Sequence, residues 1–305
     1  MSIDEQIDGC QAVGTYLLET FADVCELYGI GFFLNAGTLI GAFRNGGWLA
    51  WDDDVDVLMF RTEYERFKTL AAADLPSGVS LVDPVDDKSC ATVVPRLSYE
   101  DSGLKWIERL GIQPPERQRL LLDIFVLDHA PDSAPVRTIW NRLAALLIDI
   151  QVLRATTSQR VLQSTEPTTV KTAALAAMAV SHALPIRAWK RLYVRVVGAY
   201  AKRQTQFVVA NGHSRHQRAK LYRRAWFPDN PQTLEFEGRR YPVPSELALL
   251  HVLFGPDFRS PPTPDQRNPH PFVDFWAVLG GRSWGAVPDG RSAPLPARGP
   301  GAAEV

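Results

Sequence analysis

The chain has 305 residues, 33 of them basic and 34 acidic, and its formal net charge of -1 gives no indication of a basic surface for nucleic acid. Apolar residues make up 46% and charged residues 22%, which excludes disorder of the whole chain and allows a sizeable core without metal or disulfide staples. The three cysteines, Cys10, Cys25 and Cys90, are too few and too far apart for a disulfide framework or a CxxC zinc site. We therefore expect a globular protein of a reducing compartment, the cytoplasm.

Two segments bear on export and membranes. The N-terminal sequence MSIDEQIDGCQAV begins with acidic residues and lacks the basic-then-apolar order of a signal peptide, so export by that route is not expected. The most membrane-like segment is 170–184, but it includes Lys171 and His182 and is shorter than the roughly 20 residues that a spanning helix needs. We interpret it as a helix that is buried or lies on a surface.

Hydrophobic spacing and turn residues predict the elements in chain order. Helices are expected at 3–28, ending at Gly29, at 39–44 after Gly37-Thr38, at 64–73 after a capping box at 62–65, and at 245–254, ending at Gly255. Strands are expected at 30–34, 52–60, 79–82, 92–99 and 120–127, followed by β structure in 220–227 and a hairpin in 234–244 that turns at Glu237-Gly238. Residues 137–203 are rich in basic residues and have helical spacing of their apolar residues, which predicts a helical region. Residues 285–305 are rich in Gly, Pro and Ala, which predicts a disordered tail.

Acidic residues gather at the start of the 52–60 strand, where Asp52, Asp53, Asp54 and Asp56 fall within five residues. Carboxylates this dense repel one another unless a cation neutralises them. Residues two apart in a strand point the same way and lie roughly 6.5 to 7 Å apart at Cα, so Asp54 and Asp56 can hold one or two hard divalent cations, whereas Asp53 faces the other way. Asp123, in the 120–127 strand, supplies a third carboxylate if the two strands are neighbours. The alternative is an ordinary solvated acidic loop.

Three segments resemble one known family. Gly37-Thr38, the Asp54-x-Asp56 strand and the Asp123 strand are similar to the nucleotidyltransferase fold, in which a glycine-led helix N-terminus faces a carboxylate triad. More narrowly, FLNAGTLIGAFRNGGWLAWDDDVDVLMFRTEYERF (33–67), LLLDIFVLDHAPD (120–132) and YPVPSELALLHVLFGPDF (241–258) resemble the signature, the second aspartate motif and the C-terminal block of the LicD phosphotransferase family.

The resemblance implies an α+β fold with a nucleotidyltransferase-like mixed sheet flanked by helices. Together with the helical pattern of 137–203, the resemblance divides the chain into four parts. These are a catalytic core at 1–133, a helical insert at 134–205, a part that completes the core at 206–284 and a tail at 285–305. Val126 and His129 stand where the family often has proline and glycine. The helical stretch matches none of the family motifs, which leaves the acceptor open.

In the LicD family the paired and the later aspartates are metal ligands, which carry over to Asp54, Asp56 and Asp123, and Asp52 also matches. The family implies an enzyme with Mg²⁺ or Mn²⁺ that moves a phospho-alcohol, such as phosphocholine or ribitol phosphate, from a CDP-linked donor to a hydroxyl of a glycan or lipid-linked glycan. Two alternatives use the same fold: a nucleotidyltransferase that transfers NMP to a small hydroxyl compound, and a non-catalytic binding module.

Four further residues are candidates for contact with the donor phosphates. Gly37 and Thr38 offer backbone N–H groups and a helix N-terminus, and we expect the Arg44 side chain to bind a phosphate oxygen. Arg96, in the 92–99 strand, faces either the phosphates or solvent.

The last predicted helix of the insert combines basic and apolar side chains, namely Arg187, Lys190, Arg191 and Arg195 beside Trp189, Leu192 and Val196. This combination suits a partner surface or an anionic membrane, and peripheral membrane contact would indicate a lipid-linked acceptor. The alternative is an ordinary packed helix.

Overall fold

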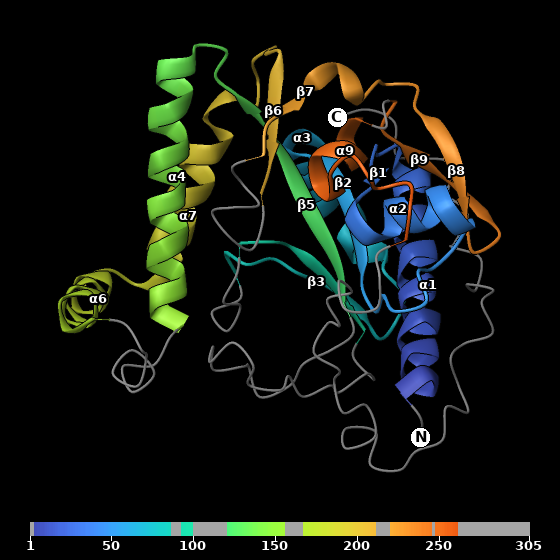
Figure 1. Cartoon of the computed structure of the whole chain (residues 1–305), viewed down its shortest axis with the longest axis horizontal. Coiled ribbons are helices and arrows are strands. Elements are labelled where there is room, and N and C mark those ends of the chain that lie inside the picture. Colours follow the sequence, from blue (N-terminus) through green and yellow to red (C-terminus); the bar gives the residue numbers. More distant parts are fainter. Residues whose placement is uncertain are drawn as a thin grey trace.

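A computed structural model describes residues 3–86, 93–99, 121–155, 167–211, 220–245 and 248–261 (Figure 1). Its α-helices are α1 (Ile3–Tyr28), α2 (Ala36–Asn45), α3 (Arg61–Arg66), α4 (Ala134–Ala155), α6 (Thr168–Ser181), α7 (Ile186–Val197) and α9 (Ala248–Phe254). Its strands are β1 (Phe33–Leu34), β2 (Val55–Phe60), β3 (Val79–Val82), β4 (Arg96–Tyr99), β5 (Leu121–Ala130), β6 (Phe207–Ala210), β7 (Tyr222–Arg223), β8 (Gln232–Phe236) and β9 (Arg239–Val243). Single helical turns of other types are η1 (Phe67–Ala71), η2 (Ala72–Asp74), η4 (Gly198–Tyr200) and η5 (Arg224–Trp226). Cys90 and the predicted tail lie outside the described residues.

Seven strands form one mixed sheet. β1, β2, β5, β4 and β3 follow one another in space, and β6 and β7 extend the sheet from the last residues of β5. β2 and β5 run parallel, whereas the other pairs in the described part of the sheet are antiparallel. β8 and β9 form a separate hairpin. The structure therefore confirms an α+β fold with a mixed sheet flanked by helices.

The two faces of β2 are covered by different parts of the chain. Alternate residues of a strand point to opposite faces. Val55 faces α1, because a Cβ added at Gly14 would lie 3.1 Å from a methyl carbon of Val55. Phe60, on the other face, packs edge-to-face on Phe227 and stacks on His129. Both faces of the strand are buried, and Asp56 lies on the same face as Phe60.

Two predicted chain reversals are confirmed in detail. α1 ends at Tyr28, and Gly29 follows in the left-handed conformation (φ +58°) that glycine adopts without strain. The β8–β9 turn has two residues with positive φ, Glu237 (+50°) and Gly238 (+80°), as type I′ hairpin turns require.

The predicted capping box at 62–65 is wrong. β2 runs directly into α3, so Phe60 is the N-cap residue and Thr62 already lies inside the first turn. Phe60 makes no side-chain cap hydrogen bond. The helix then continues as the π-helical turn η1 and the 3-10 turn η2.

α4, α6 and α7 form a helical region beside the sheet, on the left of Figure 1. α4 and α7 share a small apolar core with β6, to which Ala144, Tyr193, Val197 and Val209 contribute. Trp140 Nε1 donates a hydrogen bond to the carbonyl of Val196 at 2.7 Å. The apolar face of α7 is therefore used for packing within the protein.

A membrane-spanning helix is not found among the described residues. No single helix there is both long and apolar enough to cross a bilayer. Thr168–Ser181 and Ile186–Tyr200 meet the length and hydropathy criterion only as a pair bent by 93°.

Candidate active site

The acidic residues lie in the loop that leads into β2 and at the start of that strand. One carboxylate oxygen from each of Asp52, Asp53 and Asp54 lies within 4.8 Å of the other two. The expectation that Asp53 faces away is wrong, because side chains alternate only within a strand and β2 begins at Val55. The three loop carboxylates can together offer oxygen ligands to one hard cation.

Asp56 and Asp123 are register neighbours on the parallel strands β2 and β5, which confirms that the two acidic strands are adjacent. Asp56 is buried. Its backbone N–H donates to Thr38 Oγ1 at 2.9 Å, and its carbonyl accepts from the Asn35 N–H at 3.0 Å. These two bonds fix Asp56 against the beginning of α2.

The carboxylates form one electrostatic site. Burial raises the pKa of Asp56 well above its ordinary value, and the charges of Asp54, Asp123 and Asp52 raise it further, whereas Arg96 acts in the opposite direction. Like charges held this close disfavour ionisation of all members at once. A bound divalent cation would relieve that repulsion.

Arg96 is a positive side chain that the structure places in this site. The sequence leaves open whether it faces the donor phosphates or solvent; the structure turns it toward Asp123, and contact with phosphates stays a prediction. Its Nε donates to Asp123 Oδ1 at 2.7 Å, and the register of β4 and β5 puts the two residues side by side. The side chains are 17% and 13% exposed, so the ion pair is largely shielded from water and holds both groups in place.

The first turn of α2 lies directly against Asp52. A Cβ added at Gly37 would lie 2.1 Å from Asp52 Oδ2, so only glycine permits this approach. The N-terminal end of a helix carries partial positive charge, which favours a carboxylate there. Ala36, in the same turn, has a φ of +39°, a strained conformation that costs about 1 to 3 kcal/mol for a residue with a side chain. The predicted donor residues Gly37 and Thr38 therefore lie beside the aspartates.

Gln11 holds the aspartate loop in place, although no sequence pattern predicted it. Its Nε2 donates to the carbonyls of Leu49 at 3.0 Å and Asp52 at 2.9 Å. The preceding residue, Cys10, is buried, and burial together with the nearby charge of Asp53 raises the pKa of its thiol to about 12. α1 therefore anchors the loop that carries Asp52 and Asp53.

Arg44 does not contact the aspartates in the described structure but binds carbonyl groups of the C-terminal segment. Its guanidinium donates to the carbonyl of Phe258 and, at 2.7 Å, to that of Ser260. Gly37 and Arg44 are separated by about 10 Å along α2, so they lie toward opposite ends of the helix. Phosphate binding by Arg44 stays a prediction, and its observed partners favour a structural role in fixing the C-terminal segment to α2.

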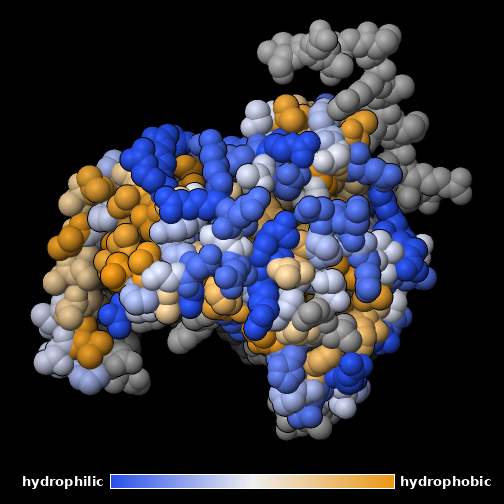
Figure 2. All heavy atoms as spheres, turned by 90° about the horizontal axis from the view of Figure 1, so that it is seen from above, coloured by the Kyte–Doolittle hydropathy of each residue, from blue (hydrophilic) through white to orange (hydrophobic). Residues whose placement is uncertain are grey.

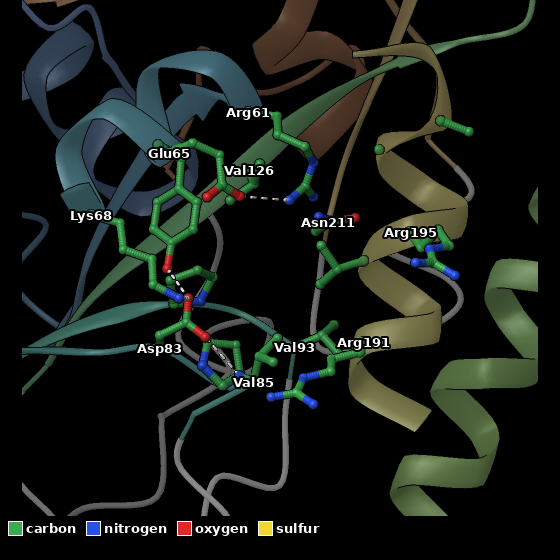
Figure 3. Close-up of a pocket in the computed structure, with 16 residues that line it drawn as sticks. Arg61, Glu65, Lys68, Asp83, Val85, Val93, Val126, Arg191, Arg195 and Asn211 are labelled. Carbon is green, nitrogen blue, oxygen red and sulfur yellow. Dashed lines mark hydrogen bonds and ion pairs between the residues drawn. The ribbon is translucent and has the colours of Figure 1, made fainter. Parts of the chain in front are cut away.

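A separate hollow of about 600 Å³ lies between α3 and α7 (Figure 3). Val126 in its wall points to the face of β5 opposite to that of Asp123. Lys68 lies at one side and donates to Asp83 at 2.9 Å, while Arg191 projects from α7 at the other side. This space is distinct from the aspartate site.

Buried polar contacts beside this hollow join the sheet to α7. Asp128 of β5 accepts hydrogen bonds from Arg61 and, at 3.0 Å, from Asn211. Tyr193 of α7 donates to Asn211 at 2.8 Å. Asp128 is fully buried, so its negative charge depends on these partners.

Comparison with known proteins gives two matches. Residues 29–110 match the model of the LicD/FKTN/FKRP nucleotidyltransferase domain, a range that includes α2, the aspartate loop, Asp56 and Arg96 but not Asp123. A stretch of 57 residues is 51% identical to the lipopolysaccharide cholinephosphotransferase LicD of Haemophilus influenzae. That stretch covers 19% of this chain and 22% of the relative, so the similarity spans about a fifth of each protein. These matches show that residues 29–110 are similar to the LicD/FKTN/FKRP nucleotidyltransferase domain.

Proposed function

We propose that the protein is a metal-dependent phosphotransferase that moves a phospho-alcohol from a CDP-linked donor to a hydroxyl of a glycan or lipid-linked glycan. The observation that carries the proposal is the group of five carboxylates, Asp52, Asp53, Asp54, Asp56 and Asp123, gathered beside a helix N-terminus. The family match supports transfer chemistry, and the name of the Haemophilus influenzae relative supports a phosphocholine-type group.

The residues fit a divalent cation of the Mg²⁺ or Mn²⁺ type. Every candidate ligand is a carboxylate, and hard cations prefer oxygen ligands. The three loop aspartates, with Asp56 and Asp123, would hold the ion, since the raised pKa of Asp56 indicates that these charges need compensation. When bound, a divalent cation supplies positive charge that offsets the charge of the donor diphosphate.

The surrounding groups would position the donor. The first turn of α2 presents backbone N–H groups to anionic oxygens, and Gly37 allows a close approach there. Thr38 contributes by fixing the backbone of Asp56, because its hydroxyl oxygen already accepts the Asp56 N–H. Arg96 adds positive charge on the β4 side of the site.

The transfer itself needs little beyond positioning and one proton acceptor. The acceptor hydroxyl oxygen forms a bond to the phosphorus next to the alcohol, the bond from that phosphorus to the CMP oxygen breaks, and CMP leaves. We assign receipt of the hydroxyl proton to Asp123, which Arg96 holds in a fixed orientation.

Transfer of NMP to a hydroxyl compound is the second candidate, favoured by the nucleotidyltransferase description of the matching family model. It would use the same residues, but the other phosphorus of a nucleotide donor would be attacked. The mass of the product distinguishes the two reactions.

The test is a panel of CDP-choline, CDP-ribitol and CDP-glycerol with purified protein and Mg²⁺ or Mn²⁺, read by CMP release and product mass. We expect one donor to release CMP, and Asp54→Ala and Asp123→Asn to abolish that release. Asp229→Ala is the matched control, because this carboxylate is 95% exposed and pairs only with Arg224 among the described salt bridges. Full activity of Asp54→Ala, or donor binding without turnover under any metal condition, would contradict the proposal.

A further inference from the structure

The helices of the insert expose more apolar surface than their packing explains. α4 presents Val136, Ile139, Leu143 and Leu146, which are 42–69% exposed and are spaced by three and four residues. This spacing puts them on one side of the helix. The adjacent side of α4, with Trp140, Ala144 and Leu147, is the one buried against α7 and β6, so the exposed residues extend the apolar surface beyond that contact.

α6 adds a second exposed apolar face. Val170, Ala173, Ala177 and Val180 share one side of the helix and are exposed, with Val180 at 67%. The sole charged residue in α6 is Lys171, which is half-buried on another side. A surface helix of a globular protein ordinarily carries charged and polar residues on its solvent side, so this face lacks the expected composition.

The two faces lie at the same end of the molecule. Figure 2 shows apolar side chains gathered on the left, where α4 and α6 lie in Figure 1. α6 is held across the C-terminal part of α4, where Arg154 donates to the carbonyl of Ser181 and contacts His182 Nδ1 at 2.7 Å. We define the α4–α6 surface as the eight exposed residues named above.

The excess of basic residues in the insert indicates what kind of surface the α4–α6 surface binds. Residues 134–205 contain eleven of the 33 basic residues of the chain and only two of the 34 acidic ones, Asp149 and Glu166. The rest of the chain is therefore acidic, and the positive charge is concentrated in the insert, where α4 and α6 contribute Arg137, Arg142, Arg154 and Lys171. Apolar faces on a strongly basic background fit an anionic lipid surface.

A second copy of the chain fits less well. The exposed stripe of α4 runs only from Val136 to Leu146, whereas a helical pair of the coiled-coil type needs three to four heptads. α6 appears nearly end-on in Figure 1 while α4 runs lengthwise, so one straight partner helix could not follow both stripes. A lipid surface is flat and accommodates helices at any angle within its plane.

We propose that the α4–α6 surface binds the surface of an anionic lipid membrane, with Ile139, Leu143, Leu146 and Val180 entering the interface. Contact through α7 stays a prediction, and the larger exposed apolar faces belong to α4 and α6. Most apolar residues of α7 pack inside the protein, although Leu192 is 40% exposed, and Arg191 and Arg195 line the hollow beside α3. If the proposed function also holds, this contact would bring the aspartate site near lipid-linked acceptors.

The test is co-sedimentation of the full chain with vesicles of phosphatidylglycerol and phosphatidylcholine, compared with phosphatidylcholine alone, at physiological salt. We expect binding to the anionic vesicles only, and a loss of at least about tenfold in partitioning for Ile139→Glu/Val180→Glu. Leu70→Glu is the matched control, because Leu70 is 49% exposed but lies in η1, outside the insert. Ile139→Ser/Val180→Ser should give a smaller loss without adding charge.

The readout is independent of catalysis, so it separates this proposal from the proposed function. Circular dichroism establishes that each variant is folded. The proposal is overturned if the wild type does not bind anionic vesicles or binds both vesicle types equally. It is likewise overturned if Ile139→Glu/Val180→Glu and Leu70→Glu partition onto the anionic vesicles to the same extent. It is also overturned if the wild type is a dimer by light scattering and the glutamate pair is a monomer, since a second copy then covers the surface.

Discussion

Replacing Gly37 by alanine should displace the Asp52 carboxylate and weaken divalent cation binding. The new Cβ would lie 2.1 Å from Asp52 Oδ2 and 3.0 Å from its Cγ. Non-bonded heavy atoms settle at about 3.5 Å, so the oxygen must move by more than about 1 Å. Metal–oxygen distances vary by only about 0.2 Å, and the carboxylate would therefore leave its position as a ligand. We expect the affinity for Mn²⁺ to fall about 10- to 100-fold.

Calorimetric titration of Mn²⁺ into wild type and variant measures this effect, with thermal unfolding monitored in parallel. Gly31→Ala is the control, because a Cβ at that position meets nothing within 4 Å. Asp52→Ala should reproduce the loss without overpacking, which separates a missing ligand from a distorted backbone. If both Gly37→Ala and Asp52→Ala bind Mn²⁺ like the wild type, Asp52 is not part of a cation site and the reasoning is refuted.

Two further predictions concern stability. In metal-free protein the raised pKa of Asp56 means that ionising this group in the folded state costs free energy, so its contribution to stability is complete below the ordinary aspartate pKa and is lost as the pH rises through the raised value. Asp56→Asn should flatten that decline in urea unfolding as the pH is raised above the ordinary aspartate pKa of about 3.9, and an unchanged pH profile would contradict the shift. Arg44→Ala should cost about 1 to 2 kcal/mol of unfolding free energy, because the carbonyls of Phe258 and Ser260 lose a charged donor, and it should leave donor affinity unchanged in calorimetry. Loss of donor affinity without loss of stability would instead support the predicted phosphate-binding role of Arg44.

The elements that the sequence predicts well are those that depend on local patterns. α1 follows from the apolar spacing that ends at Gly29, and the β8–β9 turn follows from the Glu237-Gly238 pair. The strands of Asp56 and Asp123 are also predicted by local patterns, as apolar runs that each carry an acidic residue, whereas their adjacency is only a condition in the sequence and is shown by the sheet pairing.

The parts that could not be predicted depend on loop conformation or on distant partners. Asp53 joins its neighbours because the loop before β2 does not follow strand geometry. Gln11 contacts carbonyls some forty positions away, and a glutamine on an amphipathic helix carries no signal of such a contact. Arg44 meets Phe258 only because the C-terminal segment folds back on α2, which no local pattern specifies.

The pairing of β5 with β6 makes the whole helical region, in topological terms, the loop of a hairpin. Ala130 and Phe207 are register partners, so the chain leaves and rejoins the sheet at neighbouring positions. The entropy of closing a loop grows only with the logarithm of its length, and lengthening a four-residue turn to span 131–206 costs about 2 to 3 kcal/mol. Contacts of α4 and α7 with β6 offset that cost. Insertions and substitutions between β5 and β6 can therefore change what the protein docks on while the geometry around Asp123, on the preceding part of β5, stays the same.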